Sequence, residues 1–163
     1  MTETWKPTSE QSDRLFAELG RCLYIYQSIE IRLKFLLPHM VVPGTETHAE
    51  NEGIANWRVF LDSKETMGPL MQRLKDRINT EQRDLFDATW TQIVMHRNEV
   101  VHHFASQPFA CLATEVELQE AIEYLHKRRI LATPMFEMLQ QLSLAFEKVL
   151  KSEESLHDSA PLH

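Results

Sequence analysis

The sequence predicts an all-α protein, an antiparallel helical bundle of four main helices plus short helical pieces. Glycine accounts for only 4 of 163 residues, so the chain lacks the dense turn signals that separate the short strands of all-β domains. Apolar residues recur at intervals of three and four, the spacing of one helix face, and the length suits a single core. We therefore expect one helical domain over residues 12–151, between a flexible N-terminus (1–11) and a flexible tail (152–163).

The first helix is expected to begin at a capping serine, Ser9 or Ser12, and to end at Pro38, which cannot continue a helix. Its apolar face consists of Leu15, Leu19, Cys22, Tyr26, Ile29, Leu33 and Leu36. A neighbouring stripe consists of Phe16, Leu23, Glu30 and Leu37. Glu30 thus occupies a place where apolar residues stand one heptad before and after it.

Residues 39–57 have the composition of a polar loop, and residues 57–62 suit a short helical turn. A second helix is expected from about Thr66 to Ile78, and a third over 81–103 with Thr80 as its N-cap. The apolar face of the third helix consists of Phe86, Trp90, Ile93, Arg97, Val100 and Phe104. Arg97 is the only polar member of that stripe.

A loop containing Pro108 is expected over 105–114, followed by a fourth helix over 115–131. Thr133 and Pro134 then have the pattern of an N-cap and a first-turn proline, which predicts a separate fifth helix. Its apolar face would consist of Met135, Leu139, Leu142, Phe146 and Val149. The chain becomes polar after Lys151.

Composition limits the classes of partner. The net charge of −7 opposes sequence-independent binding of long nucleic acid, which depends on many phosphate contacts, but it allows a local phosphate site. The basic clusters at 73–77 and 127–129 are typical of solvated helix faces. No apolar run approaches the roughly 20 residues that span a membrane. The two cysteines, Cys22 and Cys111, lie far apart in the sequence, and no signal peptide is recognised. We therefore expect free thiols in a reducing cytoplasm. We expect no membrane partner.

The segment Arg97–Phe104, RNEVVHHF, carries the candidate functional residues. Arginine is rarely buried without a partner, so an arginine within an apolar stripe needs an explanation. Glu30 interrupts the first helix in the same way. Either both side chains extend to the surface, or the two form a partly buried ion pair, within one chain or between two.

His102 and His103 follow Arg97 by five and six residues. A fixed guanidinium beside imidazoles that titrate near neutral pH is suited to chemistry on a phosphodiester. Five residues of ideal helix correspond to a rotation of about 140°, which places Arg97 and His102 on different faces. Either the helix unwinds near His102, or two copies complete each other's sites across a two-fold axis.

The series Arg97, Asn98, three residues and His102 resembles the R-N-x3-H form of the HEPN superfamily motif, R-x4–6-H. In that family the motif lies toward the end of a long helix in an all-α bundle. The segments QSIEIRLKFLL, with its internal glutamate, and TMGPLMQRL extend the similarity to bacterial members over roughly residues 12–150. Arg32 and His39 also satisfy the bare pattern, but Pro38 interrupts them.

The resemblance implies a metal-independent endoribonuclease that acts as a homodimer, of the toxin–antitoxin or antiphage defence type, with a possible antitoxin protein as partner. By resemblance, His102 would transfer the proton of the ribose 2′-hydroxyl, Arg97 would hold the phosphate, and Asn98 would orient or polarise the reacting groups. The products would carry 2′,3′-cyclic phosphate and 5′-hydroxyl ends. His103 is a second candidate imidazole, and the sequence does not choose between the two. No cofactor is expected.

Two alternatives remain open at the level of sequence. The pattern E-x-x-H occurs at Glu99–His102, Glu123–His126 and Glu154–His157. Paired E-x-x-H motifs bind two metals in ferritin-like bundles, although there they normally lie on alternate helices. The other alternative is a non-catalytic helical dimerisation or interaction module, because some HEPN members are binding modules and a motif alone does not establish activity.

Overall fold

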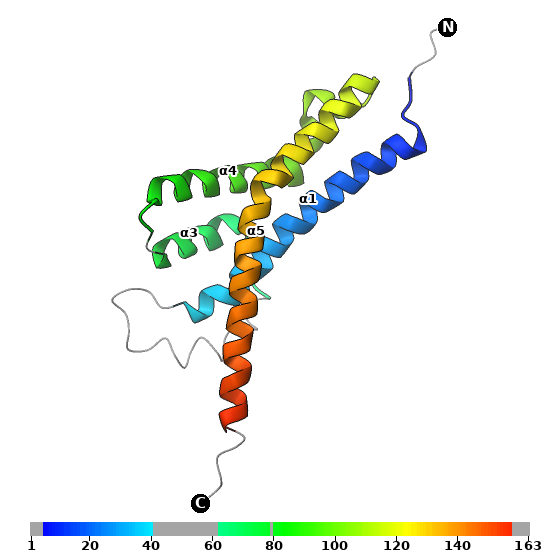
Figure 1. Ribbon diagram of the computed structural model, residues 1–163. Helices are drawn as coiled ribbons and strands as arrows, with labels where there is room; N and C mark the ends of the chain where they lie inside the picture. Colours follow the sequence, from blue (N-terminus) through cyan, green and yellow to red (C-terminus); the bar gives the residue numbers. More distant parts are fainter. Residues whose placement is uncertain (1–4, 41–61, 79, 158–163) are drawn as a thin grey trace, which may run out of the picture.

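The computed structural model describes residues 5–40, 62–78 and 80–157, with side chains as far as Ser152. This part of the chain contains four α-helices and three short 3-10 turns (Figure 1). In chain order the elements are α1 (Ser9–Leu36), η1 (Leu37–His39), α3 (Met67–Arg77), α4 (Arg83–His102), η2 (Phe104–Ser106), η3 (Pro108–Cys111) and α5 (Glu115–His157). The described residues contain no strand, so the predicted all-α class is confirmed.

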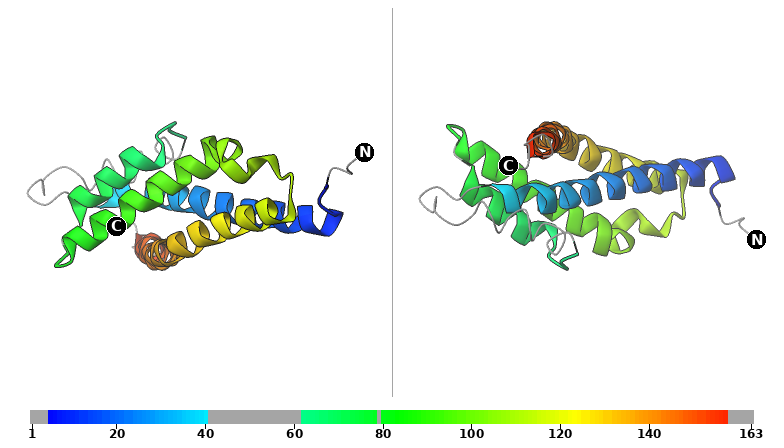
Figure 2. Two further views of the ribbon diagram at one scale, coloured as in Figure 1. Left: turned by 90° about the horizontal axis from the view of Figure 1, so that it is seen from above. Right: turned by 90° about the horizontal axis from the view of Figure 1, so that it is seen from below.

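The helices are not all antiparallel. α3 and α4 form an antiparallel hairpin that packs on α1, and α5 packs along α1. In Figures 1 and 2, however, α1 and α5 begin at the same end of the molecule and run in the same general direction. The reason is the connection from α4 to α5, in which η2 and η3 return the chain to the neighbourhood of the beginning of α1.

The first helix begins at a capping box rather than at either predicted serine. The Thr8 hydroxyl accepts a hydrogen bond from the Gln11 backbone at 3.2 Å, and the Gln11 side chain accepts one from the Thr8 backbone at 2.9 Å. This reciprocal arrangement requires Glu or Gln three residues after the cap. A cap at Ser9 or Ser12 would place Ser12 or Leu15 there, so only Thr8 satisfies the motif.

α5 is continuous across Pro134, which corrects the prediction of two helices over this region. The Thr133 hydroxyl donates to the Arg129 carbonyl at 2.9 Å, within one helix, instead of capping a new one. Proline leaves the Ile130 carbonyl without its helical donor, but Ile130 is exposed, so water can reach that position. Figure 1 shows α5 changing direction near its middle, as expected of a helix with an internal proline.

The core follows the predicted stripes on α1 and α4. The buried side chains of these helices include Leu15, Cys22, Tyr26, Ile29, Leu33, Leu36, Trp90, Ile93 and Val100. On α5, Met135 and Leu139 are buried as expected, whereas Leu142 and Val149 are half exposed. The last turns of α5 extend past the end of α1 (Figure 1), and the helix continues beyond Lys151 to His157.

Both cysteines are free thiols, as predicted, but their surroundings differ. Cys22 is fully buried and its Sγ donates to the Leu125 carbonyl at 3.1 Å. Burial raises the pKa of the Cys22 thiol to about 12, which keeps it protonated and unreactive. Cys111 is exposed.

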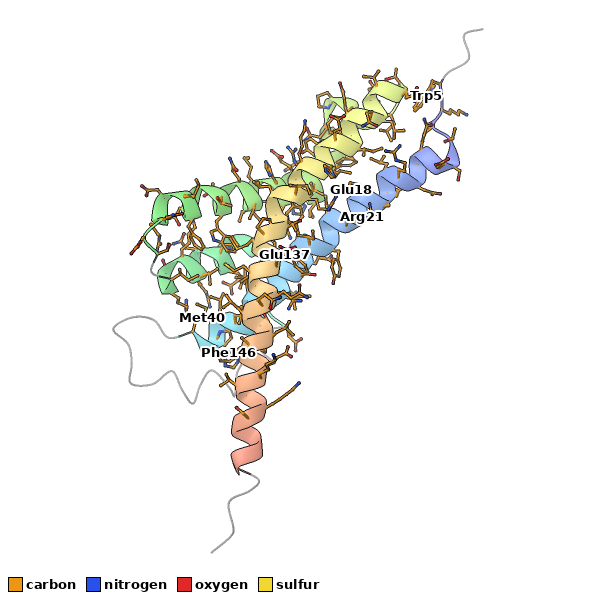
Figure 3. The ribbon with its side chains drawn as sticks, in the orientation of Figure 1. Trp5, Glu18, Arg21, Met40, Glu137 and Phe146 are labelled. Atoms are coloured by element: carbon orange, nitrogen blue, oxygen red, sulfur yellow. The ribbon has the colours of Figure 1, made fainter. Side chains whose placement is uncertain are left out.

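A buried carboxylate joins α1 to α5. Glu18 is 5% exposed and accepts hydrogen bonds from Arg129 Nε at 2.5 Å and Arg21 Nη1 at 3.1 Å, with His126 Nδ1 at 3.4 Å (Figure 3). Burial alone would raise the pKa of Glu18, but the hydrogen bonds from Arg129 and Arg21 and the charges of Arg129 and His126 outweigh it and hold the pKa below its usual 4.5. The sequence signal was available, since Glu18 lies three residues after Leu15 and four before Cys22.

We predict that Glu18→Gln lowers the free energy of unfolding by roughly 1.5–3 kcal/mol at neutral pH, the usual worth of hydrogen bonds to a charged group. Because the folded-state pKa lies below the unfolded value, ionised Glu18 stabilises the fold above about pH 4.5. That contribution is lost as the pH falls through the folded pKa, so the difference between the two proteins should shrink there. Denaturant titrations across this range measure it.

The control is Glu137→Gln, at an exposed position on α5 (Figure 3). This substitution should change the free energy of unfolding by no more than about 0.5 kcal/mol. Equal stability of the two variants at neutral pH would contradict the role given to Glu18.

Candidate functional site

The candidate site lies at the C-terminal end of α4, where the helix meets α1. Trp90, Ile93 and Val100 are buried on one side of α4 and fix that helix against the core. α4 ends at His102, and His103 follows as its C-cap with φ −127° and ψ 9°. The motif residues therefore occupy the last turns of a helix that is held rigidly along its apolar face.

The structure brings Arg97, Asn98 and His102 together within one chain. Arg97 Nη1 lies 3.0 Å from His102 Nε2 and donates to Asn98 Oδ1 at 3.1 Å. The expectation that a straight helix keeps Arg97 and His102 apart was therefore wrong. The rotation of about 140° separates the directions in which the side chains leave the helix, but the arginine side chain is long enough to reach the last turn.

Glu30 lies beside Arg97, as the two interruptions of apolar stripes predicted. Glu30 Oε2 is 3.8 Å from Arg97 Nη2 in the same chain, and the two side chains are 23% and 16% exposed. Glu30 Oε1 is also 3.6 Å from Lys34 Nζ, which donates to the Ser63 carbonyl at 2.7 Å. Because the pair is long and partly solvated, we expect it to stabilise the fold by about 1 kcal/mol or less. Its main effect is to orient the guanidinium.

The contact with Arg97 bears on the hydrogen-bonding role of His102. A guanidinium has only hydrogen-bond donors, so His102 Nε2 is the acceptor in this contact, which requires the tautomer with its proton on Nδ1. The accepting nitrogen of the imidazole therefore lies next to a permanent positive charge. His102 is exposed to solvent, whereas the Arg97 side chain is only 16% exposed.

The two histidines differ in their surroundings. The ring of His103 lies 6.3 Å from that of His102, centroid to centroid, and its side chain makes no hydrogen bond within the described residues. Its backbone N–H donates to the Glu99 carbonyl at 2.9 Å, and its own carbonyl accepts from Gln107 Nε2 at 3.2 Å. The structure thus places His102, and not His103, against the arginine of the motif.

A second network, which the sequence analysis missed, attaches the motif turn to α5. Glu99 Oε2 accepts from Arg128 Nη2 at 2.6 Å, Arg128 Nε at 3.1 Å and the Tyr124 hydroxyl at 3.1 Å. The Arg128 guanidinium also lies over the Tyr124 ring, 3.2 Å from its centroid. Burial raises the pKa of Glu99, but the hydrogen bonds and charge of Arg128 outweigh it and lower the pKa. This network fixes the residue that follows Asn98.

The basic cluster 127–129 is correspondingly not a solvated face. The side chains of Arg128 and Arg129 are 16% and 22% exposed, and each forms an ion pair with a carboxylate on another helix. Lys127 alone matches the prediction, since it is 76% exposed and pairs only loosely with Glu123 at 4.0 Å.

The same contacts bear on the di-metal alternative. Glu99 is engaged by Arg128 and Tyr124, and His126 lies against Glu18 and Arg129. In the part of the chain that the structure describes, no three His, Cys, Asp or Glu side chains gather where one metal ion could bind them. The side chains of Glu154 and His157 lie outside the described residues. The ferritin-like arrangement therefore has no support here.

The fold and the site define the chain as an all-α helical protein with an arginine–histidine pair at the end of α4. A scan against protein-family models and searches of curated proteins and of solved structures each found no match. Among the described residues, no helix combines the length and the apolar character needed to cross a membrane. The function must therefore be argued from the geometry of the site itself.

We predict that His102 is in the Nδ1–H tautomer at about pH 8, where histidine is neutral, because Arg97 occupies Nε2. The ¹⁵N chemical shifts of the imidazole nitrogens, read from a long-range proton–nitrogen spectrum, distinguish the tautomers. Arg97→Met keeps a long side chain without a hydrogen-bond donor and should abolish the preference of His102 for the Nδ1–H tautomer. His103, whose side chain makes no hydrogen bond within the described residues, is the internal control for the chemical shifts. A protonated Nε2 on His102 in the unmodified protein would rule out this hydrogen bond.

Proposed function

We propose that this protein is a metal-independent endoribonuclease of the HEPN type, acting in the cytoplasm in toxin–antitoxin or antiphage defence. The observation that carries the proposal is the distance of 3.0 Å between Arg97 Nη1 and His102 Nε2. This distance brings an imidazole nitrogen beside a permanent cation at the C-terminal end of α4. These are the two groups that cleavage of RNA through its own 2′-hydroxyl needs.

In this mechanism His102 Nε2 accepts the proton of the ribose 2′-hydroxyl. The 2′-oxygen forms a bond to the adjacent phosphorus, and the bond from phosphorus to the 5′-oxygen of the next nucleotide breaks. The products carry a 2′,3′-cyclic phosphate and a 5′-hydroxyl. The leaving 5′-oxygen takes up one proton, for which His103 is the neighbouring second imidazole.

Arg97 stabilises the charge that develops on the non-bridging phosphate oxygens. To bind them, Nη1 exchanges its contact with His102 for the phosphate, which frees the imidazole lone pair at the same moment. Asn98 Oδ1 and Glu30 hold the guanidinium from two sides and so act as positioning residues. Because the net charge is −7, this local contact is a better fit to the chain than a long basic RNA-binding surface.

Cleavage should depend on His102 and not on a metal ion. We predict that His102→Ala lowers the rate of RNA cleavage by about 10²–10⁴-fold, the usual contribution of a general acid–base group, and that His103→Ala has a smaller effect. The assay is run in EDTA, where the unmodified protein should stay active. Melting curves confirm that the exposed substitutions leave the fold intact.

Equal cleavage by the unmodified protein, His102→Ala and His103→Ala would remove the nuclease assignment. Activity that disappears on chelation and returns with a divalent metal would move the assignment to carboxylate–histidine chemistry.

The non-catalytic interaction module is the second candidate function. One observation favours it: Met138, Leu142 and Val149 are exposed along one side of α5. If the protein cleaves no RNA, the interaction module becomes the better-supported function.

The proposal includes a homodimer with the motif helix near the two-fold axis, and an antitoxin protein as the partner that a toxin of this class implies.

Val101 is 40% exposed immediately before His102, so an interface at this end of α4 would cover it. We predict a dimer at micromolar concentration that Val101→Glu dissociates, because a buried charge opposes association. Sedimentation measures the mass. Val116→Glu, at an exposed position on α5, is the control, and a monomeric unmodified protein would contradict the prediction.

A further inference from the structure

A pocket lies beside the motif, between α3 and α4. Its volume is about 430 Å³, and its lining includes Gly68 and Met71 from α3 and Trp90, Val94, Met95 and Asn98 from α4. We propose that this pocket is a nucleobase-binding subsite, which holds the base of a nucleotide flanking the phosphodiester that Arg97 and His102 cleave. The proposal rests on the proposed function, because it takes the motif as the reacting centre.

The pocket and the motif share one face of α4. Met95, Asn98 and His102 follow one another at intervals of three and four residues, so their side chains line up along the helix. Seven residues of α-helix rise about 10 Å, a length comparable with one nucleotide of an extended strand. Asn98 belongs to both places: it lines the pocket, and its Oδ1 accepts from Arg97 Nη1 at 3.1 Å.

The lining suits a flat heteroaromatic ring. Met95, which is 49% exposed, offers a polarisable thioether, and Val94 an apolar surface, against which the face of a base can lie. The volume falls within the range of small-molecule sites, roughly 300–1,000 Å³. A base stacked here would leave its sugar and phosphate outside, toward the exposed end of α4.

One donor that the fold does not use distinguishes the pocket from a purely apolar cavity. Asn98 uses only its Oδ1 within the described residues, which leaves the amide N–H₂ available for an acceptor on a base edge. Such a donor matches the ring nitrogens and carbonyl oxygens of a nucleobase. Trp90, which is completely buried, closes the wall of the pocket toward the core.

The electrostatics favour a neutral ring over an anion. Lys75 is the cation in the lining, and its Nζ lies 3.4 Å from Asp87 Oδ1, which offsets its charge. The pocket thus has no uncompensated positive charge with which to draw a phosphate. In this proposal the phosphate binds at Arg97 and the base binds in the pocket. The two chemically different parts of a nucleotide thus bind at neighbouring places on α4.

Gly68 allows the pocket to be filled without removing any side chain. A Cβ at Gly68 would meet Val94 Cγ1 at 3.8 Å, an ordinary contact. Gly68→Leu therefore places a side chain in the space that the base would occupy. Gly20→Leu is the matched control, because Gly20 is exposed on α1 and a Cβ there meets nothing within 4 Å.

The experiment measures kcat/KM on an RNA with one cleaved bond and on two versions that lack the base on one side or the other of that bond. Removal of one of the two bases should lower kcat/KM about 10- to 100-fold in the unmodified protein and in Gly20→Leu, the range expected for one stacked base. Gly68→Leu should cleave the intact RNA more slowly by a similar factor and should not respond to removal of that base. Gly68→Leu that behaves like Gly20→Leu on all three RNAs overturns the proposal.

Binding of an uncleavable 2′-O-methyl dinucleotide, measured by calorimetry, separates this proposal from the proposed function. Binding by the unmodified protein and by His102→Ala, but not by Gly68→Leu, supports the subsite even if no RNA is cleaved, in which case the nuclease assignment alone fails. Equal binding by Gly68→Leu and Gly20→Leu, or no binding by the unmodified protein, overturns the subsite. A change of mass in Gly68→Leu with unchanged dinucleotide binding also overturns it and marks this face as a protein interface.

Discussion

Three carboxylate–guanidinium pairs join the helices α1, α4 and α5, and they constrain how these helices fit together. Each two of these helices are connected by one such pair. Glu18 pairs with Arg129 between α1 and α5, and Glu99 pairs with Arg128 between α4 and α5. Glu30 pairs with Arg97 between α1 and α4. Glu18 is the most buried of the three carboxylates, and truncating one partner of a buried pair leaves an uncompensated charge, which is costly. The pairs thus add direction to the non-directional apolar packing, most strongly where α5 meets α1.

The three pairs are not equally tight. The two that involve α5 have contacts of 2.5 Å and 2.6 Å, whereas Arg97 lies 3.8 Å from Glu30 and divides its donors among Glu30, Asn98 and His102. Arg128 and Arg129 are committed to holding the fold. Arg97 is the arginine whose partners can be exchanged, which is what binding a phosphate at that position requires.

Local pattern was enough to predict the helical class and most of the core, because a spacing of three and four residues is a direct geometric signature of a helix face. It failed where structure depends on distant contacts. Pro134 stays inside one helix because Met135 and Leu139 are buried on the core side while Ile130 is exposed. The parallel course of α1 and α5 could not be predicted, because neither helix encodes the path of the chain between them.

The candidate site could likewise be predicted only in part. Glu30 and Arg97 could be paired from the sequence, because each interrupts an apolar stripe, and the structure confirms their proximity. Glu18 gives the same signal and was missed. The contact of Arg97 with His102 was misjudged because a helical projection represents where side chains begin and not how far they reach. That His102 rather than His103 lies against Arg97 depended on that reach, so the linear pattern could not reveal it.

The continuity of α5 across Pro134 has a geometric consequence. The helix has 43 residues, about 65 Å at 1.5 Å per residue, and its first half carries Arg128 and Arg129, which pair with α4 and α1. After the proline, Leu139 and Ser143 remain buried and Phe146 packs against Phe35 and His39, so α5 stays against the bundle as far as Phe146. A helix changes direction most easily where its hydrogen-bond ladder is interrupted. The bend at Pro134 therefore lets a single helix keep its ion pairs near its beginning and its aromatic contacts near the end of α1.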